Sequence, residues 1–295
     1  MHDVAVIGTG PAGCAAAVQC RRLGLDVALV DTLGKAGGLI REARLIENYP
    51  GLEKPLAGPA FADRLISILS ANDLEIRCYH ADSIALRGGI FEISGNGESI
   101  RSQSVIVAVG TVPKDFSIQV SGNVKIHRSI LELKQQLPGR TVIVGGGEAA
   151  VDYALNLSDS GSSVSLLVRG SRLKAVGKLR DKIERRKAVK ILYNTGSVTA
   201  TASEGVIQLE AESSGRKIIL ETDALLAAVG REPRLPRIMN GFVHERGNVR
   251  TSIQGLYVSG DASLGSLGQA AMASGQGLQA ALYAFELLKA GNGKS

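Results

Sequence analysis

The sequence contains an internal repeat: residues 6–13, Val-Ile-Gly-Thr-Gly-Pro-Ala-Gly, return as residues 143–150, Ile-Val-Gly-Gly-Gly-Glu-Ala-Ala. The correspondence continues without a gap, at the same offset of 137 residues, as far as Leu29 and Leu166. Each copy passes from an apolar run through a glycine-rich turn and an Ala/Leu-rich stretch to a second apolar run. This order is typical of strand, helix and parallel strand, so the chain is predicted to contain two βαβ units.

Both glycine-rich turns have the spacing of a dinucleotide-binding turn. The first glycine permits a tight turn, the second lets the backbone approach a diphosphate, and the third position stays small for helix–strand packing. Backbone N–H groups at the start of the helix then stabilise the diphosphate. The predicted contacts are Gly8, Gly10, Pro11, Ala12 and Gly13 in the first copy, and Gly145, Gly147, Glu148 and Ala149 in the second.

The ends of the two second strands differ. Asp31 ends the first, 23 residues after Gly8, where a carboxylate accepts hydrogen bonds from a ribose 2′-hydroxyl of FAD or NAD. Val168 stands at the equivalent position of the second copy. It is followed by three cations, Arg169, Arg172 and Lys174, which suit a 2′-phosphate. We therefore expect NADPH rather than NADH there; the alternative is a basic surface that contacts no phosphate.

Length and composition indicate two ordinary domains. The chain has 295 residues and is 44% hydrophobic. No apolar run approaches the ~18 residues of a membrane span, and residues 1–7 enter a strand without a secretory signal, so a cytoplasmic protein is expected. Aromatic content is 4% with no Trp, and no nucleic-acid-binding motif occurs, so no nucleic-acid partner is expected.

The three cysteines form no Cys-X-X-Cys pair. Cys14 and Cys20 fall on one predicted helix, separated by about 9 Å of rise. A disulfide needs Cα atoms within about 7 Å, so these two cannot pair in that helix and are interpreted as small interface residues. Cys78 is expected to be a buried strand residue. No metal site is predicted.

The net charge of +6 is concentrated in a predicted helix over residues 178–187. This run is either a solvated helix face or a docking surface for an acidic electron carrier such as ferredoxin or flavodoxin.

Six further segments occur in a characteristic order. They are Gly-Lys-Ala-Gly-Gly-Leu (34–39), Ile-Glu-Asn-Tyr-Pro-Gly (46–51), Val-Ala-Val-Gly (107–110), Ala-Ala-Val-Gly (227–230), Gly-Asp (260–261) and Gly-Gln-Ala (268–270). Together with the repeat, they resemble the scaffold of low-molecular-weight thioredoxin reductases over nearly the whole chain. Leu39 replaces the usual Gln of that family, and Gly268 replaces its Arg.

The resemblance implies an α/β fold of two Rossmann-like domains of the three-layer ββα type. An FAD domain of residues 1–112 and 236–295 would surround an NAD(P)H domain of residues 113–235, with hinges near Pro113 and residues 233–236. It also implies a homodimer. The FAD contacts that it adds are Gly37, Gly38, Leu39, Asn48, Gly110, Gly260, Asp261, Gln269 and Ala270.

The redox disulfide of the resembling family is missing. Its two positions fall at about Arg128 and Leu131, so no thiolate is available there. This excludes thioredoxin reduction by the family's mechanism. His127 is a weak catalytic candidate, which either presents a proton near the flavin or caps a helix. The family's His-Arg-Arg segment is also only partly kept, since Gly170 replaces one Arg and Lys174 another.

The sequence thus predicts an FAD-dependent NAD(P)H oxidoreductase that passes electrons to an external acceptor: a ferredoxin- or flavodoxin-type carrier, a quinone or dioxygen. Two alternatives stay open. One is a flavoprotein with a degenerate NADPH site that acts as a binding or sensing subunit. The other is a flavin-dependent dehydrogenase or oxidase of a small organic substrate, for which Arg128 would suit an anion.

Overall fold

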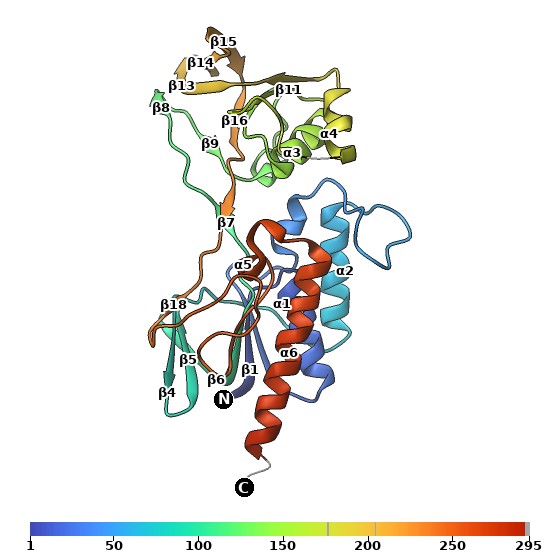
Figure 1. The fold of residues 1–295 in the computed structure, drawn as a ribbon, viewed down its shortest axis with the longest axis vertical. Helices are drawn as coiled ribbons and strands as arrows, with labels where there is room; N and C mark the ends of the chain where they lie inside the picture. The colour runs from blue at the N-terminus through green and yellow to red at the C-terminus, as the bar shows by residue number, and fades with distance from the viewer. Residues whose placement is uncertain (176, 204, 293–295) are drawn as a thin grey trace. The chain divides into compact units, whose positions relative to one another are not determined.

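The computed structural model describes residues 1–175, 177–203 and 205–292 of the chain, which form two compact units (Figure 1). Unit 1 contains Met1–Arg41, Leu45–Val112 and Glu232–Ser295, and unit 2 contains Glu42–Arg44 and Pro113–Arg231. The return to unit 1 therefore falls four residues before the expected end at residue 235. The grouping of Glu42–Arg44 with unit 2 is not foreseen by the sequence.

Unit 1 is built on an eight-stranded mixed sheet in the order β18-β4-β5-β6-β1-β2-β3, with β19 beside β6. Strand β1 is parallel to β2 and β6, as the βαβ repeat requires, whereas β4, β5 and β6 form an antiparallel meander. The strands are β1 (His2–Ile7), β2 (Val27–Asp31), β3 (Arg77–Cys78), β4 (Ser83–Arg87), β5 (Ile90–Gly95), β6 (Glu98–Val107), β18 (Arg237–Ile238) and β19 (Leu256–Val258).

The two faces of the central strand β1 pack into two different cores, because successive side chains of a strand point to opposite faces. Val4 and Val6 join one core with residues of α1 and α6, and Ala5 and Ile7 join the other with residues of β5. The helices of unit 1 are α1 (Pro11–Arg22), α2 (Gly58–Ser70), α5 (Asp261–Leu264) and α6 (Ala270–Asn292), with the 3₁₀ turn η3 (Gly265–Leu267). A further 3₁₀ turn, η1 (Gly38–Glu42), ends at the boundary with unit 2.

Unit 2 contains two sheets. A five-stranded parallel sheet has the order β12-β11-β10-β16-β9, and a four-stranded sheet has the order β15-β14-β13-β8. The parallel strands are β9 (Ile126–His127), β10 (Arg140–Val144), β11 (Ser163–Leu167), β12 (Val189–Leu192) and β16 (Ala224–Ala227). The second sheet contains β8 (Gln119–Ser121), β13 (Thr195–Ser203), β14 (Val206–Ser213) and β15 (Arg216–Thr222). The helices are α3 (Glu148–Asp159) and α4 (Gly177–Glu184), with the 3₁₀ turn η2 (Ile130–Glu132).

The parallel sheet of unit 2 lies between the helices and the second sheet. On β10, Ile143 packs into a core with α3 residues, whereas Val142 packs against Leu209 of the second sheet. The resulting order of sheet, sheet and helix confirms the predicted three-layer ββα fold.

The two chain crossings between the units pair as a two-stranded sheet of β7 (Val112–Pro113) and β17 (Arg231–Glu232). Within the part of the chain that the structure describes, no helix is long and apolar enough to cross a bilayer.

Candidate nucleotide-binding sites

The first glycine-rich turn joins β1 to α1 and leaves no room for side chains at two of its glycines. Gly8 has φ +101°, and a Cβ there would collide with the carbonyl of Ala108. A Cβ on Gly13 would overlap the carbonyl oxygen of Gly8. Gly10, by contrast, faces open space and begins α1 without a side-chain cap. The first N–H groups of α1 are therefore available to an anion, as a bound diphosphate requires.

Asp31, at the end of β2, lies beside this turn. Its carboxylate accepts the backbone N–H of Leu33 at 2.8 Å and that of Thr9 at 3.3 Å. The loop that follows returns to the same place, because the N–H of Gly37 donates to Thr9 O at 2.7 Å. Gly37 has φ +111°, and its Cβ would lie 2.6 Å from the Ala62 methyl group. The structure thus brings Asp31, the residue predicted to bind a ribose, and the Gly-Gly loop to the same turn.

Elements from the far end of the chain also meet this turn. Gly260 has φ +70°, and a Cβ there would lie 2.8 Å from the Cβ of Ala12. Asn48 donates from Nδ2 to Oε1 of Gln269 at 2.8 Å, just before α6 begins at Ala270. Beside it, the Tyr49 hydroxyl donates to Ser274 Oγ at 3.3 Å.

Gly268, which stands where the resembling family has Arg, is closely packed. A Cβ on Gly268 would collide with Oδ1 of Asp261. Gly268, which precedes the predicted contact Gln269, therefore packs directly against Asp261, the predicted FAD contact at the start of α5. Gly110 has φ +64° and, like Gly10, faces open space. These open glycines beside a capless helix start fit a flavin dinucleotide.

The second glycine-rich turn, in unit 2, repeats this design. Gly145 has φ +151°, and a Cβ there would collide with the carbonyl of Ala228, whereas Gly147 faces open space. Val168 is buried and packs on the turn: a Cβ on Gly146 would lie 2.8 Å from its Cγ1. An apolar side chain therefore occupies the place that Asp31 has in unit 1.

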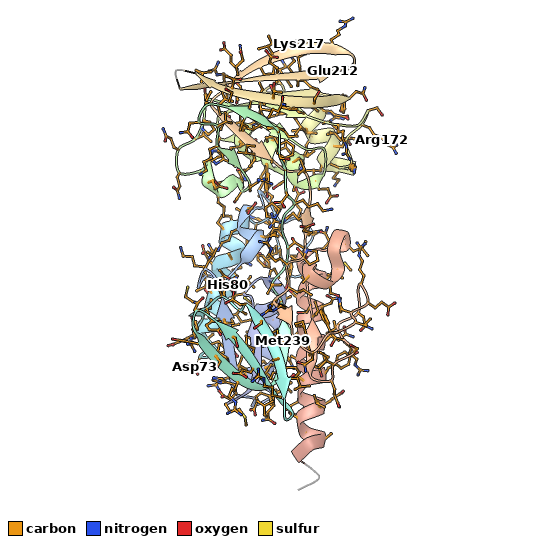
Figure 2. All side chains as sticks on the ribbon, turned by 90° about the vertical axis from the view of Figure 1, so that its left-hand side faces the viewer. Asp73, His80, Arg172, Glu212, Lys217 and Met239 are labelled. Atoms are coloured by element: carbon orange, nitrogen blue, oxygen red, sulfur yellow. The ribbon has the colours of Figure 1, made fainter. Side chains whose placement is uncertain are left out.

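Beside the second turn is a pocket of about 1030 Å³. All seven residues that the sequence assigns to NADPH line it: Gly145, Gly147, Glu148, Ala149, Arg169, Arg172 and Lys174. The three cations are exposed, and Arg172 projects from the surface of unit 2 (Figure 2). Its remaining walls come from residues 113–119, 195–199 and 227–231, together with Arg128, Tyr153 and strand-end residues. Its size and its cations fit a phosphorylated dinucleotide.

The turn at the expected disulfide positions is organised by Glu132. The Glu132 carboxylate accepts the N–H groups of Arg128 and Ser129 at 3.1 and 3.2 Å, and pairs with Lys125 and His127 at 3.0 and 3.2 Å. Burial raises the pKa of Glu132, but these donors outweigh burial and lower the pKa to about 2. His127 thus pairs with the Glu132 carboxylate, but the cap of this turn is Ser129, so His127 is not itself the capping residue; its catalytic role stays a prediction.

Unit 2 also contains a buried carboxylate that sequence reasoning missed. Glu42 accepts hydrogen bonds from the hydroxyl of Ser129, at 3.0 Å, and from the hydroxyl of Tyr153. Burial, together with the charge of Glu42, raises the pKa of Tyr153, so the phenol stays protonated and donates. The partners are 87 and 111 residues away in the sequence, and no local motif could have indicated the cluster.

The cysteines give one correction. Cys14 and Cys20 are buried as predicted, and burial raises the pKa of each thiol to about 12. Cys78 is exposed, so the expectation of a buried residue was wrong. The reason is topological: β3 is the edge strand of its sheet, and both of its residues face solvent. The described residues include no cluster of metal-ligating side chains.

Comparison with known proteins relates both units to one family. The family model of pyridine nucleotide-disulphide oxidoreductases matches residues 2–277. The chain is 25% identical over 306 residues to a thioredoxin reductase of Borreliella burgdorferi, covering 98% of this chain and 93% of that protein. It is 27% identical over 312 residues to the bifunctional thioredoxin reductase/thioredoxin of Mycobacterium leprae, covering 96% of this chain but only 65% of that protein.

The fold likeness extends to solved structures. A Lactococcus lactis thioredoxin reductase in the FR conformation superposes with a TM-score of 0.88 at 23% identity, covering 98% of this chain and 99% of that one. Thioredoxin reductase-like proteins use FAD and NADPH, the two cofactors that the sequence predicts. The chain therefore belongs to the pyridine nucleotide-disulphide oxidoreductase family.

Proposed function

We propose that the protein is an FAD-dependent NADPH oxidoreductase that delivers electrons directly to an external acceptor, without an internal disulfide. When bound, FAD supplies a ring system that accepts a hydride from reduced nicotinamide and returns two electrons to an acceptor. The observation that carries the proposal is that two equivalent glycine-rich turns have side chains of opposite charge beside them. Asp31 is hydrogen-bonded to the first turn, whereas a cation-lined pocket adjoins the second.

Each residue has a defined part in this reaction. The N–H groups at the starts of α1 and α3 bind the two diphosphates. Asp31 accepts a ribose hydroxyl in unit 1, and Arg169 and Lys174 neutralise the 2′-phosphate in unit 2. These groups bind and orient the two nucleotides, and the chemistry of electron transfer belongs to the cofactors.

Thioredoxin reduction through an internal dithiol is not part of the proposal. Arg128 and Leu131 stand at the expected cysteine positions, and neither carries electrons. Cys14 and Cys20 are buried thiols whose pKa of about 12 leaves almost no thiolate at neutral pH. Sustained NADPH oxidation that depends on added thioredoxin would contradict this part of the proposal.

The direct test is anaerobic reduction of the purified yellow protein. NADPH is expected to bleach the flavin absorbance rapidly and NADH more slowly, because only NADPH carries the phosphate that the cations bind. Flavin released by heat and quantified in parallel gives the occupancy of each preparation. Absence of bleaching by both nucleotides, in protein with full flavin content, would overturn the proposal.

A basic segment of unit 2 favours an acidic carrier among the possible acceptors. Residues 169–190 contain ten cations and two acids, a net charge of +8, which exceeds the +6 of the whole chain. Such a concentration of charge attracts acidic proteins over a Debye length. Reoxidation of the bleached flavin by ferredoxin or flavodoxin, faster than by quinone or dioxygen and slowed by salt, is the expected result.

A second candidate function is a flavoprotein subunit whose second site binds a nucleotide without reacting. Glu148 lies in the first turn of α3 and lines the pocket, where its carboxylate opposes a diphosphate. Gly170 also removes one cation from the phosphate-binding loop. Nucleotide binding by calorimetry without any flavin bleaching would favour this candidate over the oxidoreductase.

A further inference from the structure

The segment Lys114–Ile118 forms one wall of the pocket in unit 2 but belongs to no sheet. It lies between β7 and β8, and all five of its residues line the pocket. Its first N–H donates to the carbonyl of Gly230 at 3.0 Å. Fixing a free backbone costs conformational entropy at every residue, so an irregular wall of this length needs other groups to hold it.

Ile118 anchors one end of this wall by packing against a core of unit 2, and Arg128 holds the other end. Its guanidinium donates from Nη1 to Lys114 O at 2.6 Å and from Nη2 to Phe116 O at 2.7 Å. Two charge-assisted hydrogen bonds from one planar group fix alternate carbonyls of the segment at once. Lysine cannot reproduce this geometry, because its ammonium is a single point of donation on a flexible stem.

Arg128 is itself held in place by the turn around Glu132. The carboxylate accepts the backbone N–H of Arg128 at 3.1 Å while it closes the capping box with Ser129. A chain of contacts therefore runs from Glu132 to Arg128 and on to the carbonyls of Lys114 and Phe116. Lys114 and Phe116, at the end of this chain of contacts, line the nucleotide pocket.

We propose that Arg128 is a positioning residue that preorganises the Lys114–Ile118 wall of the nucleotide pocket. The turn that carries a redox pair in thioredoxin reductases would here serve nucleotide affinity instead. This inference rests on the proposed function, in that the nucleotide is NADPH. A wall that is already ordered before binding does not lose conformational entropy when the nucleotide binds. Loss of Arg128 should therefore weaken nucleotide affinity and leave the electron-transfer step unchanged.

The test compares Arg128→Gln and Arg128→Lys with the control Arg180→Gln, which removes an exposed cation of α4 outside the pocket. In the flavin-loaded protein, both Arg128 variants are expected to raise the dissociation constant and the KM for NADPH about 5- to 20-fold. The kcat with ferricyanide, the flavin content and the Tm should stay close to those of the native protein. Hydrogen exchange should increase in the peptide that covers residues 114–118, and the control should change none of these quantities.

Three results would overturn the inference. Full NADPH affinity in Arg128→Lys would show that the charge alone matters, and unchanged affinity in both variants would show that the wall needs no fixing. Unchanged exchange in residues 114–118 would show that Arg128 does not hold the segment. Failure of the native protein to bind or oxidise NADPH is a different result, which overturns the proposed function; the exchange experiment needs no nucleotide and would still decide whether Arg128 holds the segment.

Discussion

Lys174 donates its backbone N–H to the carbonyl oxygen of Gly146 at 2.7 Å, which ties the loop after β11 to the glycine-rich turn after β10. The loop carries three exposed cations, and the turn leads into α3, whose first residues line the pocket. This backbone hydrogen bond therefore joins the loop of the proposed phosphate-binding side chains to the turn proposed to bind the diphosphate. The cations depend on the fold of the turn for their position.

This arrangement predicts a nucleotide preference that single substitutions can reduce. Arg169→Ala and Lys174→Ala should each raise the KM for NADPH by roughly 10-fold or more, because a charge-assisted hydrogen bond contributes about 1.5–3 kcal/mol. The KM for NADH should change little. Lys178→Ala, a cation of the same region outside the pocket, is the control. Equal losses for both nucleotides would show that the cations do not contact the 2′-phosphate.

The first turn predicts different outcomes at two of its glycines. Gly13→Ala should lower stability strongly, because its Cβ would overlap the carbonyl of Gly8 in a backbone that cannot move away cheaply. Gly10→Ala should fold normally, since nothing lies within 4 Å of its Cβ, but should bind less flavin. Tm and the flavin-to-protein ratio separate the two effects. A normal flavin ratio in Gly10→Ala would argue that the cofactor does not approach this glycine.

The lowered pKa of Glu132 predicts that the stability of the protein falls at acidic pH. Its folded pKa of about 2 lies below the usual glutamate value of 4.5, so its contribution to stability is complete above pH 4.5 and is lost as the pH falls toward 2. About a third of the side chain is exposed, so solvent screening reduces this contribution to about 1–2 kcal/mol. The free energy of unfolding of the native protein should exceed that of Glu132→Gln by this amount at pH 7, and the difference should shrink toward pH 3. A difference that is constant with pH would contradict the assignment.

The three thiols should differ in reactivity. Cys78 is exposed, whereas Cys14 and Cys20 are buried with raised pKa values. A maleimide added to the native protein at pH 7 is therefore expected to label one cysteine per chain, and to label three after denaturation. Peptide mapping identifies the site. Labelling of Cys14 in protein that keeps its flavin would show that the helix interface of α1 opens more readily than its burial indicates.

The fold was predictable because its signals are local and repeated. The two glycine turns, Asp31 and the loop after Val168 all lie within single βαβ units, where spacing determines structure. The burial of Cys78 was predicted wrongly because strand order is a long-range property, and the sequence does not show that β3 is an edge. The contacts of Arg128 with the carbonyls of Lys114 and Phe116 could not be predicted either, because every residue has a backbone carbonyl and the sequence does not show which ones accept.

The membership of Glu42–Arg44 in unit 2 has a practical meaning for dissection of the protein. A gene fragment that encodes only residues 113–231 would lack the acceptor of the Tyr153 hydroxyl and the guanidinium that Arg44 places on Asp159. The hydroxyls of Tyr153 and Ser129 would lose their acceptor Glu42, and Asp152 and Asp159 would each lose a donor of Arg44, although Asp159 would keep its pair with Arg186. An isolated unit 2 should for this reason include residues 42–44, either by circular permutation or as a peptide added in trans, before any loss of nucleotide binding is attributed to the absence of unit 1.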